Sequence, residues 1–188
     1  MILLSYMHGL LVGRFQPFHL GHLSAVEYAL KSMDILWLVI GSADKSHEPR
    51  NPFTAGERLE MIKYALDAHG IDSRRWHAVP VYDASIHYLW VAQVNMLVPR
   101  YDVVFTNDPF SRMLFEEYGR GKEVREVPLL NRAEFSGTEV RRRIANGEDW
   151  RQLVPEHVAS VIDDIDGVRR IKMLYAMMGV DLHRHGYG

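Results

Sequence analysis

The regular alternation of short apolar runs with amphipathic helical patterns is the strongest constraint in this sequence. The run at 35–43 is nearly continuous and is typical of a strand that is buried on both faces of a parallel sheet. The other apolar runs are, in chain order, 8–13, 76–81, 102–107 and the weaker 123–129. The helical patterns between them are 23–33, 55–69, 87–98 and 110–118. Strands and helices that alternate in this way form right-handed βαβ units around a parallel sheet.

After this region the pattern becomes wholly helical, with segments predicted at 137–146 and 155–177. We therefore predict an α/β fold, a Rossmann-like doubly wound parallel sheet with helices on both faces and a helical C-terminal part. The 188 residues are expected to form a single domain. Its predicted parts are an α/β core at 7–130, the helical part at 131–178 and a frayed polar tail at 179–188.

Composition narrows the classes of function. The chain has no cysteine, which excludes disulfides, iron–sulfur clusters, thiolate zinc sites and a cysteine nucleophile, and which fits a cytoplasmic protein. Lys and Arg number 22 against 24 Asp and Glu, so the formal charge of -2 predicts neither a nucleic-acid nor a membrane partner. The apolar start MILLSYMHGLLVG is too short and too interrupted to span a bilayer, and it lacks the pattern of a signal peptide.

In a doubly wound sheet, ligands bind beyond the carboxyl ends of the strands, and the string GRFQPFHLGH leaves the first predicted strand there. Gly13 frees the backbone at the strand exit, and Arg14 adds a permanent cation. His19 and His22 are three residues apart at a helix start and so project from one face, with Gly21 leaving room for a flat group or a phosphate. Together with the helix N–H groups they predict an anion site. A structural pair or a metal site is the alternative for the histidines, although no third zinc ligand is obvious.

A second string, FSGTEVRRR, opens a helix late in the chain. Ser136 and Glu139 predict a capping box, and Arg141 lies one turn inside the helix. The functional reading is a second anion site that opposes the first. The alternative is a well-capped helix with exposed arginines. Arg142 and Arg143 are expected to be solvated or in salt bridges.

The two strings, the second as SxTxxR, resemble those of the HxGH nucleotidyltransferase superfamily, and in particular of its archaeal-type nicotinamide-mononucleotide adenylyltransferases. The segments RNPFTAGER and WRQLVPEHV and the pair Leu89–Trp90 extend the resemblance over nearly the whole chain. The resemblance implies direct in-line transfer of AMP from ATP to nicotinamide mononucleotide, which forms NAD and releases pyrophosphate. It also implies a homo-oligomer, specifically a hexamer.

The resemblance also assigns residues to roles. His22 would stabilise the α-phosphate, and Arg141 would hold the β- and γ-phosphates that leave. The implied catalytic residues are Arg14, His19, His22 and Arg141. The expected ATP- and phosphate-binding residues are Gly13, Phe15, Gly21, Arg50, Asn107, Ser136 and Thr138. Of these, Asn107 is assigned from its position at the end of the predicted strand 102–107, where we expect a contact with adenosine. The implied nicotinamide mononucleotide-binding residues are Asp83, His87 and Trp90. Mg²⁺ is expected to be held mainly by the ATP phosphates and water, without assigned protein ligands.

Several interpretations stay open. From the residues alone, Trp90 on an amphipathic helix is a core residue, and Arg58 is a structural partner for an acid. His87 stands where relatives often carry Asn, which affects recognition of the amide or ribose. Two other functions compete: transfer of a nucleotide to another phosphate, such as phosphopantetheine or glycerol phosphate, and non-catalytic nucleotide binding. Trp90 and the FTAGER segment oppose the first, and the histidines with Arg14 and Arg141 oppose the second.

Overall fold

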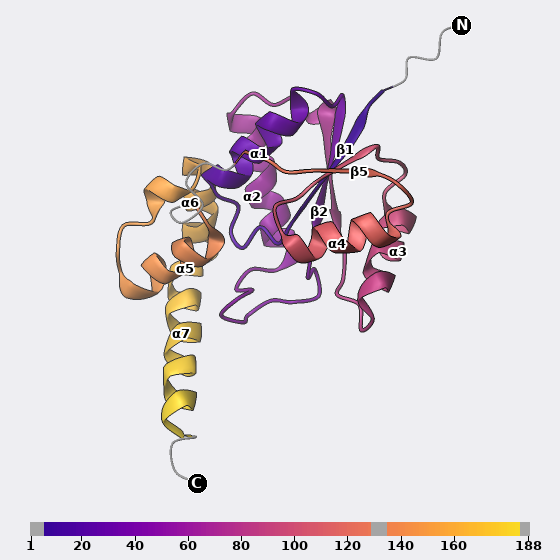
Figure 1. The fold of residues 1–188 in the computed structure, drawn as a ribbon. Coiled ribbons are helices and arrows are strands. Elements are labelled where there is room, and N and C mark those ends of the chain that lie inside the picture. The colour runs from indigo at the N-terminus through magenta and orange to yellow at the C-terminus, as the bar shows by residue number, and fades with distance from the viewer. Residues whose placement is uncertain (1–5, 129–134, 185–188) are drawn as a thin grey trace, which may run out of the picture.

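The computed structural model describes residues 6–128 and 135–184, with side chains up to residue 178. Predictions on residues 1–5, 129–134 and 185–188 lie outside the described residues. The centre of the molecule is a parallel five-stranded sheet of order β3-β2-β1-β4-β5 (Figure 1). The strands are β1 (His8–Gly13), β2 (Ile35–Ile40), β3 (Trp76–Pro80), β4 (Val103–Phe105) and β5 (Glu123–Arg125). The strand order reverses between β1 and β4, which is where a doubly wound sheet opens a crevice for ligands.

Helices cover both faces of this sheet, as the alternating pattern predicts (Figure 1). The helices of the α/β part are α1 (Leu20–Leu30), α2 (Ala55–Ala68), α3 (His87–Leu97) and α4 (Pro109–Tyr118). Those of the C-terminal part are α5 (Gly137–Asn146), α6 (Glu156–Asp164) and α7 (Gly167–Arg184). Two short 3₁₀ turns, η1 (Ser73–Arg75) and η2 (Arg151–Leu153), complete the described elements.

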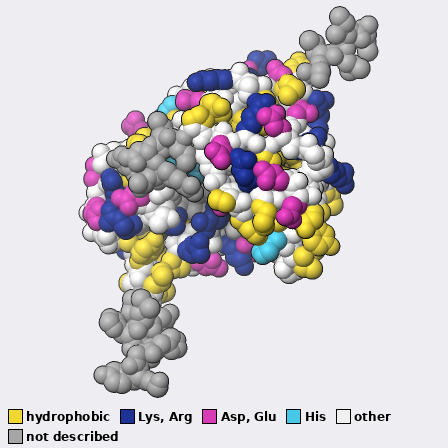
Figure 2. Space-filling view, in the orientation of Figure 1, with side chains coloured by type: hydrophobic (Ala, Val, Ile, Leu, Met, Phe, Trp, Pro, Cys, Tyr) yellow, Lys and Arg dark blue, Asp and Glu magenta, His cyan; other side chains and the backbone are white. Residues whose placement is uncertain are grey.

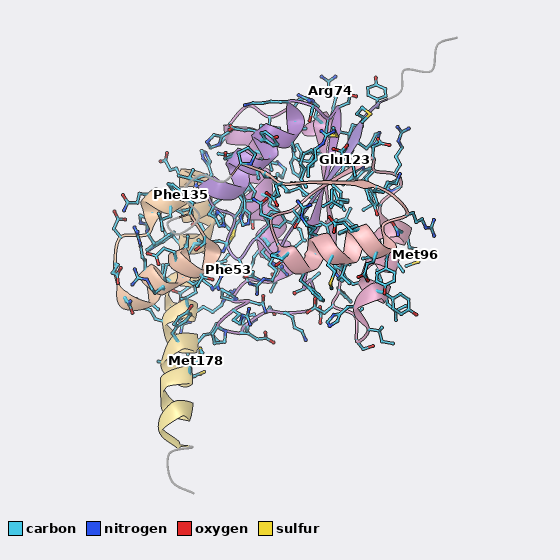
Figure 3. All side chains as sticks on the ribbon, in the orientation of Figure 1. Phe53, Arg74, Met96, Glu123, Phe135 and Met178 are labelled. Carbon is cyan, nitrogen blue, oxygen red and sulfur yellow. The ribbon has the colours of Figure 1, made fainter. Side chains whose placement is uncertain are left out.

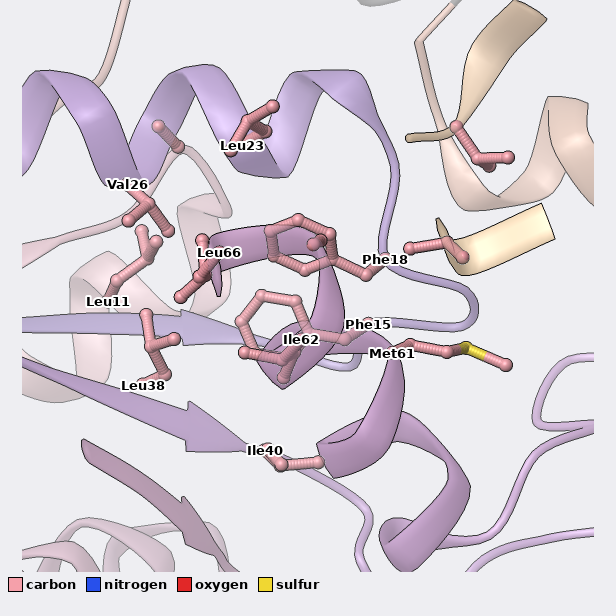
Figure 4. Packing of buried hydrophobic residues seen from close by; sticks show 14 of the residues in the cluster. Leu11, Phe15, Phe18, Leu23, Val26, Leu38, Ile40, Met61, Ile62 and Leu66 are labelled. Atoms are coloured by element: carbon pink, nitrogen blue, oxygen red, sulfur yellow. The ribbon is translucent and has the colours of Figure 1, made fainter. Parts of the chain in front are cut away.

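Alternate strand residues feed two separate hydrophobic cores, because successive side chains of a strand point to opposite faces. Leu11, Leu38 and Phe105 belong to the core shared with α1 and α2. Figure 4 shows this packing, in which Leu23 and Val26 from α1 meet Ile62 and Leu66 from α2 over the strands. The residues of the second core, shared with α3 and α4, include Leu10, Val39, Val91, Val94, Val104, Leu114 and Phe115.

The C-terminal helices extend the first of these cores and lie beside α1 and α2, on the far side of the molecule from α3 (Figure 1). The predicted continuous helix at 155–177 is wrong, because the chain turns at Ile165 and Asp166 and forms two helices. Asp166 adopts a left-handed conformation with φ of 55°, which ends α6 before α7 begins. The backbone of 179–184, predicted to be a frayed tail, is the last part of α7.

The strands β4 and β5 are shorter than the predicted 102–107 and 123–129. Beyond Phe105 a side chain takes over the pairing: the Asn107 amide donates to the Val127 carbonyl and accepts from the Val127 N–H, both at 2.8 Å. Helix α1 begins three residues earlier than predicted, because His19 caps it. None of the helices in the described part of the chain is long and apolar enough to cross a membrane.

Candidate active site

The loop from β1 to α1 is held rigidly at the carboxyl end of the sheet. Phe15 and Phe18 bury their rings in the core (Figure 4). The Gln16 side chain donates to the Phe53 carbonyl at 2.8 Å and accepts from the Phe53 N–H at 2.9 Å. This pair of bonds ties the loop to the segment that enters α2. The backbone around the predicted anion site is therefore fixed by packing and by hydrogen bonds.

His19 and His22 cap the first turn of α1 reciprocally. Each imidazole Nδ1 accepts the backbone N–H of the other residue at 3.3 Å, and the rings stack with centroids 3.6 Å apart. Because Nδ1 is an acceptor in both rings, the hydrogen of each neutral imidazole lies on Nε2. The pair therefore carries two Nε2–H donors without carrying a charge.

Burial keeps this pair neutral. Desolvation, followed by the nearby charge of Arg141, lowers the pKa of His19 to about 3. Desolvation, followed by the neighbouring His19, lowers the pKa of His22 well below its ordinary value of 6.5. Burial disfavours the charged form of an imidazole, so both rings stay neutral at pH 7.

The second string forms the start of α5, where Ser136 accepts the Glu139 N–H at 3.2 Å. The predicted return bond from Glu139 is absent among the described contacts, because this carboxylate pairs with Arg142 and Arg143, both at 2.8 Å. The predicted capping box is therefore wrong in its second half. The expectation that Arg142 and Arg143 form salt bridges is confirmed.

Arg141 behaves differently from the two arginines that follow it. Its side chain is buried, with only 4% of the residue exposed. Nη1 donates to the Gln16 carbonyl at 2.6 Å, and Nη2 donates to the Thr138 hydroxyl at 3.3 Å. Nε has no hydrogen-bond partner among the described residues. Arg141 thus links the second string directly to the loop that carries the first.

Two glycines allow the strings to pack against each other. A Cβ on Gly137 would lie 2.9 Å from the Gln16 carbonyl oxygen, and one on Gly21 would lie 3.0 Å from the Phe135 carbonyl oxygen and from the His19 ring. Contacts this short leave no space for a side chain. The expectation that Gly21 leaves room for a ligand is therefore wrong, because His19 and Phe135 fill that space.

A cleft of about 1210 Å³ opens beside this junction, beyond the carboxyl ends of β1, β2, β3 and β4. It lies at the opposite end of the sheet from Arg74 and Glu123 (Figure 3). Figure 2 shows that Lys and Arg side chains on the visible described surface are interspersed with Asp and Glu. The residues that line the cleft are Val12, Gly13, Arg14, His22, Gly41, Ser42, Glu48, Pro49, Arg50, Asn51, Asp83, Ala84, His87, Trp90, Asp108, Phe110, Ser111, Leu114 and Met178.

One wall of the cleft is cationic. Arg14 and Arg50 both line it, and Arg14 Nη1 contacts the Asn51 side-chain oxygen at 3.4 Å. Desolvation and then the charge of Arg50 lower the pKa of Arg14. Neither arginine has a carboxylate within 4 Å in the described part of the chain, so both charges remain available to an anion. With the His22 ring beside them, they form a wall suited to phosphate oxygens.

Another part of the cleft lining is aromatic and acidic. Trp90 meets Phe115 edge-on at 5.9 Å, and His87 meets Phe110 edge-on at 4.9 Å. The sequence left open whether Trp90 is a core residue or a binding residue. In the structure it packs on the second core and also lines the cleft. The Asp83 carboxylate accepts from the Ser42 hydroxyl at 3.0 Å. An aromatic face beside a carboxylate suits a flat cationic ring.

Comparisons with known proteins show the family of the chain. Residues 10–143 match the family of cytidylyltransferase-like proteins. The chain is 47% identical over 161 residues to a nicotinamide-nucleotide adenylyltransferase of Methanolobus tindarius, covering 86% of this chain and 90% of that one. It is 46% identical over 170 residues to the enzyme of the same name from Archaeoglobus fulgidus, covering 88% and 96%. The chain belongs to the nicotinamide-nucleotide adenylyltransferase family.

A solved structure shares the fold. The bifunctional NMN adenylyltransferase/ADP ribose pyrophosphatase of Francisella tularensis superposes with a TM-score of 0.80 at 22% identity, covering 95% of this chain and 55% of that one. The identity is low, so this likeness concerns the fold alone. It agrees with the predicted Rossmann-like doubly wound sheet.

The structure separates the predicted site residues of this adenylyltransferase-family chain into two groups. Those that line the cleft are Gly13, Arg14, His22, Arg50, Asp83, His87 and Trp90. Those that lie behind its wall or away from it are Phe15, His19, Gly21, Asn107, Ser136, Thr138 and Arg141. Each polar atom of the Asn107 amide makes one hydrogen bond with Val127, which leaves one N–H and one oxygen lone pair for the predicted contact with adenosine.

Sequence reasoning missed several residues of the cleft. Gly41 and Ser42 follow β2, and Asp108 and Phe110 follow β4, so the rule about carboxyl ends of strands could have found them. Met178 comes from α7, far along the chain, and no local signal points to it. Arg58 was expected to pair with an acid, but it donates to backbone carbonyls instead.

The reciprocal capping predicts the tautomer and the pH response of the histidine pair. In nitrogen-15 NMR spectra at pH 7, His19 and His22 should show a bare Nδ1 and a protonated Nε2, and they should keep this state down to pH 5. His69 is an internal control with its hydrogen on Nδ1, because that atom contacts the Ala65 carbonyl at 2.7 Å. Titration of either ring of the pair between pH 6 and 7 would contradict the capped arrangement.

The lowered pKa values of His19 and His22 also predict that the protein loses stability as the pH falls. The unfolded chain takes up protons at these two histidines below about pH 6.5, whereas the folded chain does not. Their contribution to the free energy of unfolding is therefore complete above pH 6.5 and is lost as the pH falls toward the folded pKa values.

Proposed function

We propose that the chain transfers the AMP part of ATP to nicotinamide mononucleotide, which forms NAD and releases pyrophosphate. One observation carries the proposal: a single cleft combines the cations Arg14 and Arg50, which form no ion pair among the described residues, and the neutral His22 with the aromatic Trp90. Relatives named nicotinamide-nucleotide adenylyltransferase, which match nearly the whole chain, support the same reaction. The cationic wall would take the phosphates, and the aromatic wall would take the nicotinamide ring.

The proposed reaction is an in-line displacement at the α-phosphorus of ATP. A phosphate oxygen of nicotinamide mononucleotide forms a bond to this phosphorus, while the bond to the bridging oxygen breaks and pyrophosphate leaves with the electron pair. An ionised phosphate oxygen is already a nucleophile and needs no general base. Positioning of the two substrates and stabilisation of the developing charge therefore supply the rate.

Each proposed role uses a specific donor. His22 would donate its Nε2–H to the α-phosphate, and Arg14 and Arg50 would neutralise the phosphate chain. A neutral donor suits this position because its strength is set by geometry and does not change with pH near neutrality. Arg141 would hold the departing pyrophosphate, and its unpartnered Nε supports that role. His19 would contact the triphosphate and orients His22 through the reciprocal cap.

Mg²⁺ is proposed as a partner of ATP. The carboxylates on the cleft come one each from separate loops, as Glu48, Asp83 and Asp108, and the described residues hold no group of three metal-ligating side chains. These residues do not form a dedicated metal site, so most ligands would come from phosphate oxygens and water. Bound Mg²⁺ would supply charge neutralisation on the phosphates.

Assembly and location are also proposals. The resemblance to archaeal relatives supports a homo-oligomer, specifically a hexamer. Large apolar side chains are exposed on and beside α3, among them Ile86, Tyr88, Met96 and Leu97, and they offer a surface for such contacts. A cysteine-free composition supports a cytoplasmic location.

The first test of the function uses purified protein, ATP and Mg²⁺ with different acceptors. Nicotinamide mononucleotide should give NAD and pyrophosphate in a coupled assay. Faster turnover with phosphopantetheine, or with glycerol phosphate and CTP, would transfer the assignment to a related nucleotidyltransferase. ATP binding without any nucleotidyl product would indicate a non-catalytic module.

Trp90 should control the KM for the mononucleotide. Stacking of an aromatic side chain on a base contributes ~1–3 kcal/mol, so Trp90→Ala is expected to raise this KM roughly tenfold or more and to leave the KM for ATP nearly unchanged. Trp37→Ala is the matched control, because that indole lies outside the residues that line the cleft. If Trp90→Ala only lowers thermal stability, Trp90 is a core residue alone.

His22 should act on the chemical step. Loss of one preorganised donor costs about 10²–10³ in rate, so His22→Ala is expected to lower kcat in that range while ATP binding changes little. His22→Asn keeps an acceptor for the His19 N–H and separates the loss of the cap from the loss of the Nε2–H donor. A near-normal kcat with a raised KM for ATP would limit His22 to ground-state binding.

A further inference from the structure

Arg58 is the largest fully buried side chain of the protein's described part, and its environment is unusual. Its exposed fraction is 0%, yet no carboxylate lies within 4 Å of it among the described residues. Burying a guanidinium that lacks a carboxylate partner is unfavourable unless hydrogen bonds compensate for the lost hydration. Desolvation lowers the pKa of Arg58 to about 10, so it is still charged at neutral pH.

The compensating bonds all go to backbone carbonyls. Nη1 donates to the Arg14 carbonyl at 2.9 Å and to the Gly41 carbonyl at 2.8 Å. Nη2 donates to the Ser42 carbonyl at 3.1 Å, and Nε donates to the Thr54 carbonyl at 3.1 Å. One planar fork therefore joins the loop after β1, the loop after β2 and the start of α2.

The stability of α2 does not explain this placement. Arg58 is the fourth residue of the helix, near the end where the helix dipole is positive and a cation is disfavoured. That end is already capped by Thr54 and Glu57, and Glu57 pairs with Arg170 on α7 at 2.7 Å. The helix start is thus anchored without Arg58, and it serves as the base from which Arg58 reaches the loops.

The two loops need such a restraint, because each contains a non-glycine residue in a left-handed conformation. Phe15, directly after Arg14, has φ of 52°, and Ser42 has φ of 48°. Backbone in this region is strained and persists only where its surroundings hold it. Arg58 bonds the carbonyl before the first of these residues and the carbonyls on both sides of the second. The Gly41 N–H also donates to the Gly13 carbonyl at 3.0 Å, which couples the two loops.

We propose that Arg58 is a positioning residue for adenylyl transfer, which holds the two strained loops so that both substrates meet in register. Through the first loop it fixes the backbone that carries Arg14 on the phosphate wall. Through the second it fixes Ser42, whose hydroxyl holds Asp83 on the acceptor wall at 3.0 Å. The inference rests on the proposed function, because it assigns the two walls to the two substrates.

The expected consequence is a loss of rate larger than the loss of affinity. A misplacement of about 1 Å far from the reacting atoms can cost on the order of 10² in rate. Arg58→Met should therefore lower kcat about 100-fold at a temperature well below its Tm, while each KM rises only a few fold. Arg58→Lys keeps the charge but not the planar fork, and its kcat should fall at least tenfold.

Arg75 provides the matched control. It also donates to three backbone carbonyls, those of Leu30, Met33 and Asp34, but at the amino end of the sheet. Arg75→Met should lower Tm with kcat within about twofold of the unaltered protein. In hydrogen exchange measured by mass spectrometry, Arg58→Met should speed exchange at 13–18 and 41–44, whereas Arg75→Met should speed it at 30–36.

Three outcomes would overturn the inference. One is a kcat for Arg58→Met that lies within twofold of that of Arg75→Met. Another is a loss of kcat without faster exchange in either loop. The third, if Arg58→Met does not fold, is an unchanged kcat in Arg58→Lys. If the unaltered protein makes no NAD, the proposed function fails instead, and the exchange data still test whether Arg58 holds the loops.

Discussion

The backbone and side chain of Gln16 form the joint on which the candidate site depends. The side-chain amide completes the hydrogen bonding of the Phe53 backbone, while the carbonyl accepts from Arg141 and sits against Gly137. These contacts bring together segments separated by more than a hundred residues. A buried hydrogen bond contributes about 1 kcal/mol net, but leaving one partner unsatisfied costs ~1–3 kcal/mol. The loop after β1, the segment that enters α2 and the start of α5 therefore stabilise one another. Displacing any one of them leaves buried polar groups of the others without partners.

This joint explains how the two neutral histidines are held in fixed positions. The loop that it fixes ends at His19, whose cap with His22 sets both tautomers. Donors fixed in advance do not have to reorganise when charge shifts along the phosphate chain, and this is the main way in which enzymes stabilise such a change. Neutral imidazoles keep this property across the physiological pH range, because burial has moved their pKa values below it.

The sequence predicts the sheet and its layers because hydrophobic periodicity is a local signal, and each of the five short strands carries it. The Thr54–Glu57 cap at the start of α2 is another local feature, because it depends on neighbouring residues alone. Sequence reasoning fails where a side chain has several possible partners, or where a contact joins distant parts of the chain. Glu139 has two arginines within one helical turn and pairs with them instead of completing the cap. Gly21 packs against the Phe135 carbonyl, a contact that only the tertiary arrangement creates.

The same limit explains why the arginines could not be sorted from sequence. Arg142 and Arg143 are neutralised by Glu139, whereas Arg141 beside them donates to oxygens of Gln16 and Thr138. In the described part of the chain, the arginines without a carboxylate within 4 Å include Arg14, Arg50, Arg58 and Arg141.

All four of these arginines belong to the cleft or to the wall behind it. A carboxylate paired directly with any of them would neutralise its charge, whereas a carbonyl satisfies the hydrogens and leaves the net charge in place. A chain with a formal charge of -2 can therefore still offer free guanidinium groups to an anion, because Arg14 and Arg50 line the cleft with no carboxylate within 4 Å in the described part of the chain. The carbonyl-bound guanidinium groups therefore serve structure and electrostatics at once.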